Sequence, residues 1–96
     1  MSRTASDRST VAIVIPALNE ERSISACLDA VLAQTWTDLD VIVADGGSTD
    51  ATRAIVDEYG GRDGRVRIVD NPRRTQPAAL NSAVAHTDAD WIVRID

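Results

Sequence analysis

Short β-branched runs alternate with helical patterns along this chain, and this alternation constrains the fold more than any other feature. The runs expected as strands lie at residues 10–16, 41–45, 65–70 and 89–96. The segments expected as helices lie between them, at residues 23–34, 49–59 and 77–86. Regular strand–helix alternation with right-handed crossovers produces a parallel sheet between helix layers. The sequence therefore predicts an α/β domain: a three-layer, Rossmann-like parallel sheet of about four strands with helices on both faces.

The strand order is expected to be 3-2-1-4, which makes the first and fourth strands neighbours. A topological switch point then lies between them, and ligands bind outside the carboxyl ends of strands at such a point. The third strand alternates polar and apolar residues at its start, so we expect it near an edge. The fourth strand would be an exposed edge, and exposed edges favour self-association. Two glycines, Gly60 and Gly61, are expected to end the second helix.

The length of 96 residues allows at most one small domain. Residues 1–9 are polar and are expected to form a disordered tail ahead of a folded unit at residues 10–96. The net charge is −5, which argues against a nucleic-acid-binding protein. The single cysteine, Cys27, excludes an internal disulfide and fits a reducing, cytoplasmic compartment. The sequence contains no recognisable signal peptide and no apolar run long enough to span a bilayer.

Polar, turn-forming residues follow two strands that are expected to be neighbours. The second strand ends in Asp45 and runs into Gly46 and Gly47, which permit positive φ and a close approach of the backbone to a bound group. A ligand site that presents one carboxylate and a well-capped βα turn both fit this stretch. The first strand ends in a matching cluster, which contains Pro16, Ala17, Asn19 and Glu20.

Three stretches of the chain together resemble the N-terminal half of a family-two glycosyltransferase of the GT-A fold, in particular the bacterial members that build exopolysaccharides. They are Val11–Ile24, Leu39–Thr52 and Asn71–Asp96, so the resemblance covers nearly the whole chain. It implies an inverting enzyme that takes the sugar of a nucleoside-diphosphate donor, of the UDP type, to an acceptor hydroxyl. The acceptor would be a glycan or a lipid in polysaccharide or glycolipid synthesis.

The resemblance also implies roles for individual residues. Asp45 would accept a hydrogen bond from a ring N–H of the nucleobase, which suits uracil. The family often has a second acid where this chain has Gly46. Arg73 or Arg74 would steady the donor phosphates, since an arginine fork suits phosphate oxygens; two exposed loop arginines are the alternative. The remaining residues of the implied nucleotide pocket are Pro16, Ala17, Asn19, Glu20 and Gly47.

The fourth strand ends at Asp96, where the family has an acid-x-acid or acid-x-His motif that holds a divalent metal. Mg²⁺ or Mn²⁺ would suit such hard oxygen ligands and would offset charge on the leaving diphosphate. The second acid, the catalytic base and the acceptor-binding half would lie beyond residue 96. We therefore expect residues 10–96 to be a donor half that is incomplete at its C-terminal side and transfers no sugar alone. The full-length protein would stand at the cytoplasmic face of the membrane.

Two other classes of protein compete with this interpretation. A non-catalytic nucleotide-binding half-domain, or a gene remnant, would share every motif named so far. A different doubly wound protein, such as a dinucleotide-binding or receiver-type domain, fits less well. The first βα turn lacks the pattern G-x-G-x-x-G, and the absence of lysine excludes a G-x-x-x-x-G-K-[ST] loop.

Overall fold

The structure is a computed structural model that describes residues 10–34, 38–72, 78, 81 and 83–95. Its elements are β1 (Val11–Ala17), α1 (Ile24–Leu32), β2 (Leu39–Asp45), α2 (Thr52–Arg62), β3 (Val66–Asp70) and β4 (Trp91–Arg94). The predicted alternation is thus confirmed, with bounds that move by a few residues. The helix expected at residues 77–86 falls largely outside the described residues, although residues 78, 81, 83 and 84 are helical.

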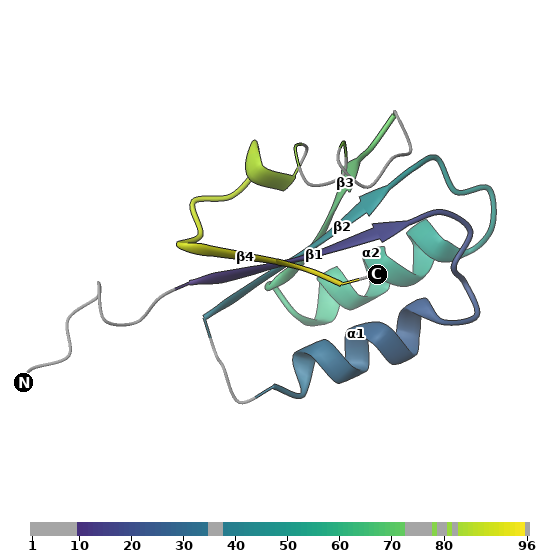
Figure 1. Cartoon of the computed structure of the whole chain (residues 1–96). Coiled ribbons are helices and arrows are strands. Elements are labelled where there is room, and N and C mark those ends of the chain that lie inside the picture. Colours follow the sequence, from purple (N-terminus) through teal and green to yellow (C-terminus); the bar gives the residue numbers. More distant parts are fainter. Residues whose placement is uncertain (1–9, 35–37, 73–77, 79–80, 82, 96) are drawn as a thin grey trace, which may run out of the picture.

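The four strands form one parallel sheet in the order β3-β2-β1-β4, as predicted (Figure 1). β1 pairs with β2 along its whole length, and this register places Ala17 beside Asp45. β2 pairs with β3 so that Asp45 lies beside Asp70. The carboxyl ends of three adjacent strands therefore bring these residues to one edge of the sheet, where ligands of such folds bind.

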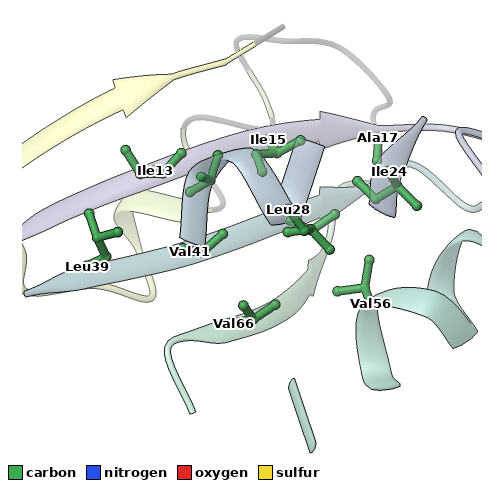
Figure 2. Close-up of a cluster of buried hydrophobic side chains, with 11 residues drawn as sticks. Ile13, Ile15, Ala17, Ile24, Leu28, Leu39, Val41, Val56 and Val66 are labelled. Atoms are coloured by element: carbon green, nitrogen blue, oxygen red, sulfur yellow. The ribbon is translucent and has the colours of Figure 1, made fainter. Parts of the chain in front are cut away.

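One face of the sheet carries both α1 and α2 (Figure 1). Large aliphatic side chains fill the space between the sheet and these helices, as Figure 2 shows. Leu28 of α1 is fully buried there and Val56 of α2 almost so. The strands contribute every second residue to this cluster, which is the alternation that a strand imposes. Its strand residues are Ile13, Ile15, Ala17, Leu39, Val41, Val43 and Val66.

The other face of the sheet is packed with smaller side chains. Ala83, from the segment expected as the third helix, is fully buried against this face. The strand residues of this second cluster are Ala12, Val14, Ile42, Ala44 and Val69. The sheet is therefore covered from both sides, as the continuous apolar runs of β1 and β2 predicted.

The end of α2 differs from the prediction. The helix does not stop at Gly60 and Gly61 but continues to Arg62, and Asp63 then adopts an extended backbone. Gly60 has a packing reason instead, because a Cβ added there would lie 3.1 Å from the carbonyl oxygen of Val66. The glycine lets the last turn of α2 approach the start of β3 closely.

The two outer strands of the sheet differ in exposure. β3 lies at one edge, as predicted, with Val66 and Val69 buried. β4 lies at the other edge and is exposed along its whole length, with Trp91 63% and Val93 45% exposed. Within the described part of the chain, no helix is long and apolar enough to cross a membrane.

Candidate functional site

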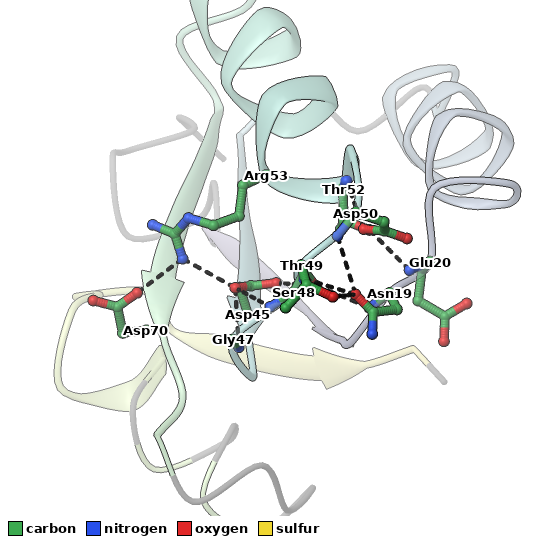
Figure 3. A network of polar contacts seen from close by, with 10 residues as sticks. All are labelled: Asn19, Glu20, Asp45, Gly47, Ser48, Thr49, Asp50, Thr52, Arg53 and Asp70. Atoms are coloured by element: carbon green, nitrogen blue, oxygen red, sulfur yellow. Dashed lines mark hydrogen bonds and ion pairs between the residues drawn. The ribbon is translucent and has the colours of Figure 1, made fainter.

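Asp45 is a buried carboxylate at the end of β2, and it is 1% exposed. Its Oδ2 accepts hydrogen bonds from the N–H groups of Gly47 and Ser48, both at 3.1 Å. The Ser48 hydroxyl donates to Oδ1, and the guanidinium of Arg53 donates to Oδ2 at 3.0 Å (Figure 3). Burying a charge is costly unless it is paired and hydrogen-bonded, and here both conditions are met.

The environment of Asp45 fixes its charge. Burial acts to raise the pKa of this carboxyl, but the hydrogen bonds from Ser48, Arg53 and Gly47 outweigh burial and hold the pKa below its usual value. Asp45 is therefore ionised at neutral pH. An ionised carboxylate only accepts hydrogen bonds, so the group can recognise an N–H donor but not an acceptor.

Arg53 joins the ends of two strands. Its Nη1 lies 3.0 Å from Oδ2 of Asp45 and 2.9 Å from Oδ1 of Asp70. Hydrogen bonds, first to Asp45 and then to Asp70, raise the pKa of this guanidinium. Neither Arg53 nor Asp70 was predicted from the sequence to be part of the site. A signal existed, because a cation in the first turn of a helix opposes the helix dipole and so indicates a dedicated carboxylate partner.

The glycine pair does two different things. Gly47 has a φ of 96°, the positive value that the turn was expected to require. Gly46 is buried, and its N–H donates to the carbonyl oxygen of Ala17 at 2.8 Å. This bond extends the β1–β2 ladder by one residue and holds the two strand ends together.

Asn19 connects the turn after β1 to the turn after β2. It has a φ of 52°, in the left-handed region that asparagine tolerates better than most residues. Its Oδ1 accepts from the N–H groups of Thr49 at 2.8 Å and Asp50 at 3.3 Å. Its own N–H donates to the hydroxyl of Ser48 at 2.9 Å. The side chain thus takes the place of a capping group on the neighbouring turn.

Further hydrogen bonds join the same two turns. The Glu20 N–H donates to Oγ1 of Thr52 at 2.8 Å. The Glu21 N–H donates to Asp50, and the carboxylate of Glu21 accepts from the N–H of Ala51, both at 3.2 Å. We call residues 19–21 and 48–52, with the hydrogen bonds between them, the turn clamp. It fixes the two turns that flank Asp45 relative to one another (Figure 3).

A pocket of about 190 Å³ lies beside the first of these turns. Pro16 and Glu20, both expected in the nucleotide pocket, line it together with Ile15, Ser23, Ile24 and Cys27. The pocket is smaller than the ~300–1,000 Å³ of ordinary ligand sites. The carboxylate of Glu20 also accepts from the Ser23 hydroxyl at 3.1 Å, so part of its hydrogen-bonding capacity serves the start of α1.

The structure thus gathers most of the predicted site residues at the carboxyl ends of β1 and β2. These residues are Pro16, Ala17, Asn19, Glu20, Asp45, Gly46 and Gly47. Arg73, Arg74 and Asp96 lie outside the described residues. Among the residues that are described, no group of three or more His, Cys, Asp and Glu side chains could hold a metal ion.

The described elements form a parallel α/β sheet with a buried carboxylate at the carboxyl end of β2, the edge at which ligands of such folds bind. Residues 12–96 match the family model described as Glycosyl transferase family 2. The chain therefore belongs to glycosyltransferase family 2, as its motifs indicated.

The chain is similar to parts of two longer curated relatives. It is 48% identical over 88 residues to the succinoglycan biosynthesis protein ExoA of Rhizobium meliloti, which covers 88% of this chain and 26% of that protein. It is 37% identical over 86 residues to a chondroitin synthase of Pasteurella multocida, which covers 90% of this chain and 9% of that protein. The chain thus spans about a quarter of the length of the first relative and a tenth of the second.

Solved structures with the same fold carry nucleotides and metal ions. A mannosyltransferase of Pyrobaculum calidifontis, in complex with GDP-Man and Mn²⁺, superposes with a TM-score of 0.79 at 29% identity, over 88% of this chain and 26% of that chain. Glucosyl-3-phosphoglycerate synthase of Mycobacterium tuberculosis, with Mn²⁺, UDP and its product, gives 0.70 at 32% identity, over 92% and 33%. These neighbours and the strand order confirm the expected GT-A fold class.

Proposed function

We propose that residues 10–96 form the donor-nucleotide half of an inverting glycosyltransferase that uses a nucleoside-diphosphate sugar. One observation carries this proposal: the ionised, buried carboxylate of Asp45 stands at the end of β2, between two turns that the turn clamp fixes. The family match and the nucleotide complexes of its structural neighbours support the same conclusion.

Asp45 would bind the nucleobase. Among the described residues, three groups donate hydrogen bonds to its Oδ2, and only the Ser48 hydroxyl donates to Oδ1. A carboxylate offers about four acceptor positions on its two oxygens, so Oδ1 retains acceptor capacity. The Asp45 side chain is fully buried in the free chain, so a base would reach Oδ1 by displacing the groups that cover it. The ring N3–H of uracil is a donor of the right kind, which is why we infer a UDP-type donor sugar. Pro16, Ala17 and Glu20 would form the adjacent wall.

The donor diphosphate would require positive charge. We infer that Asp96 supplies a ligand to Mg²⁺ or Mn²⁺, since carboxylates and phosphate oxygens are the hard ligands that these ions prefer. Such an ion, when bound, would neutralise charge on the departing nucleoside diphosphate. Mn²⁺ is present in the mannosyltransferase complex, and the synthase has been solved with either Mn²⁺ or Mg²⁺. Arg73 or Arg74 would add a guanidinium to the same phosphates.

The acceptor is proposed to be a glycan or a lipid, as expected of proteins that resemble exopolysaccharide enzymes. We assign no catalytic base to the described residues and expect no sugar transfer from the 96-residue chain.

For the full-length protein we propose a cytoplasmic location at the membrane face, which co-sedimentation with membranes would test. The exposed edge of β4 would mediate self-association. A chain that remains monomeric in analytical ultracentrifugation at high concentration would contradict self-association through β4.

Calorimetric titration of the chain with UDP tests the proposed function. Asp45→Asn keeps the size of the side chain and removes its charge, so we expect affinity to fall at least about tenfold. Asp63→Asn is the matched control, because Asp63 also pairs with an arginine, at 2.8 Å, but precedes β3 at the opposite end of the sheet. We expect that variant to bind UDP like the wild type.

Circular dichroism decides whether each titrated protein is folded. Equal UDP binding by folded Asp45→Asn and wild type, or none by a folded wild type, would refute the proposal. Mn²⁺ should strengthen binding, and Asp96→Asn should abolish this gain. A chain that binds UDP without any response to Mn²⁺ would favour the alternative, a non-catalytic nucleotide-binding half-domain.

A further inference from the structure

We propose that Arg53 is a positioning residue for nucleobase recognition: its guanidinium, anchored on Asp70, fixes Oδ2 and so the orientation of the Asp45 carboxylate. This inference rests on the proposed function and assigns a role to two residues that the motifs did not indicate.

The geometry of the bridge is the first argument. A single nitrogen, Nη1 of Arg53, contacts one oxygen of each acid, at 3.0 Å for Asp45 and 2.9 Å for Asp70. The two acids are register partners on β2 and β3, and Arg53 reaches them from the first turn of α2. The Asp45 side chain is completely buried and that of Asp70 is 79% exposed, so the contact joins an inner carboxylate to an outer one.

The charges around Asp45 are the second argument. Without Arg53, Asp45 would keep three hydrogen bonds from the turn but would lie beside the negative charge of Asp70. A neighbouring like charge and burial both favour the protonated form of a carboxyl group. Asp50, the next acid along the turn, accepts hydrogen bonds from Thr52 and from the N–H of Glu21, and as another anion it cannot offset the charge of Asp45. Arg53 therefore supplies a positive charge beside the buried carboxylate of Asp45 and separates it from the charge of Asp70.

The protonation state of Asp45 has a direct consequence for base choice. An ionised carboxylate accepts from N3–H of uracil and repels the N3 lone pair of cytosine, whereas a protonated one can donate to cytosine N3. Loss of Arg53 should therefore weaken the discrimination between the two bases. A purely structural role for Arg53 would weaken the binding of both nucleotides by the same factor.

The ratio of affinities for UDP and CDP is accordingly the quantity to measure, by calorimetry on the folded 96-residue chain. Arg53→Met keeps the aliphatic stem and removes the charge, and we expect the ratio of UDP to CDP affinity to fall about tenfold. Arg53→Lys should restore part of the ratio because it restores the positive charge. Arg65→Met is the matched control, since Arg65 pairs with Asp63 far from the site and should leave the ratio unchanged.

Each outcome decides between the alternatives. An unchanged ratio in folded Arg53→Met, or a rise in UDP affinity, would overturn the positioning role. If Arg53→Met does not fold, Arg53→Gln takes its place: the amide can still donate a hydrogen bond to Asp45 but carries no charge, and a fall in the ratio is again expected. An unchanged ratio in folded Arg53→Gln would then overturn the role of the bridge. A folded wild type that binds neither nucleotide would overturn the proposed function and this inference together. A wild type that binds UDP, with variants whose ratio of UDP to CDP affinity is unchanged, would overturn this inference alone.

Discussion

The two faces of the sheet are covered in different ways. The first face packs isoleucine, leucine and valine side chains against α1 and α2, the helices that follow the two turns of the site. The second face has a larger share of alanines: it packs Ala12, Ala44 and Ala83 together with Val14, Val69 and Ile42. The comparison indicates that the first face positions the candidate site, whereas the second face depends on close approach of the covering segment. We therefore expect the loss of side-chain volume to be costly on the first face and the addition of volume to be costly on the second.

Removal of a large side chain from the first face should have the largest effect. Leu28 is fully buried and belongs to the cluster that packs α1 against the sheet. Leu28→Ala should cost ~2–5 kcal/mol of unfolding free energy, through lost burial and a cavity. Urea denaturation followed by circular dichroism measures this cost. Ser25→Ala on the same helix is the control and should change stability by less than ~0.5 kcal/mol.

That cost is a large part of the ~5–15 kcal/mol that stabilises an ordinary domain, so Leu28→Ala could leave the chain largely unfolded at 37 °C. A loss of less than ~1 kcal/mol would mean that α1 is not packed against the sheet as described.

Addition of volume to the second face should have the next largest effect. Ala44 is fully buried there, in the cluster that contains Val69 and Ala83. Ala44→Val adds two methyl groups to a closely packed space and should destabilise the chain by ~1–3 kcal/mol, measured in the same way. A neutral or stabilising result would show that the second face is loosely covered and would remove the contrast between the faces.

The smallest predicted effect concerns the two glycines at the end of α2. Gly61 has no atom near the position of an added Cβ, so Gly61→Ala should stabilise the chain by ~0.5–1 kcal/mol through helix propensity. At Gly60 the same change would bring a Cβ to 3.1 Å from the Val66 carbonyl oxygen, so the gain should be reduced or reversed. Thermal unfolding of the two single variants compares them, and equal gains would mean that α2 and β3 can move apart freely.

The parts of the molecule that the sequence predicted depend on local patterns. Continuous apolar runs indicated strands covered on both faces, and their alternation with helices indicated a parallel sheet and its order. The turn after the second strand was recognisable because the residues that favour a turn are adjacent in the sequence, here Asp45, Gly46 and Gly47. The same reasoning failed for the end of α2, where the close contact of Gly60 with β3 is a tertiary feature.

The parts that the sequence did not predict depend on register. The bridge from Asp45 through Arg53 to Asp70 requires that the last residues of β2 and β3 lie side by side, which no local pattern specifies. The hydrogen bonds of Asn19 to Thr49 and Asp50 cross about thirty residues of sequence. Both features therefore appear only once the strands are aligned.

The turn clamp has a consequence for how the two motifs can change. Each turn supplies groups that satisfy the backbone of the other, so the amino-acid choices at residues 19–21 and 48–52 are energetically coupled. A replacement at Asn19 by a residue without a side-chain acceptor would leave the N–H groups of Thr49 and Asp50 to solvent and would remove this connection between the turns. The two turns thus act as one structural unit, and their amide groups are expected to open and exchange with solvent together.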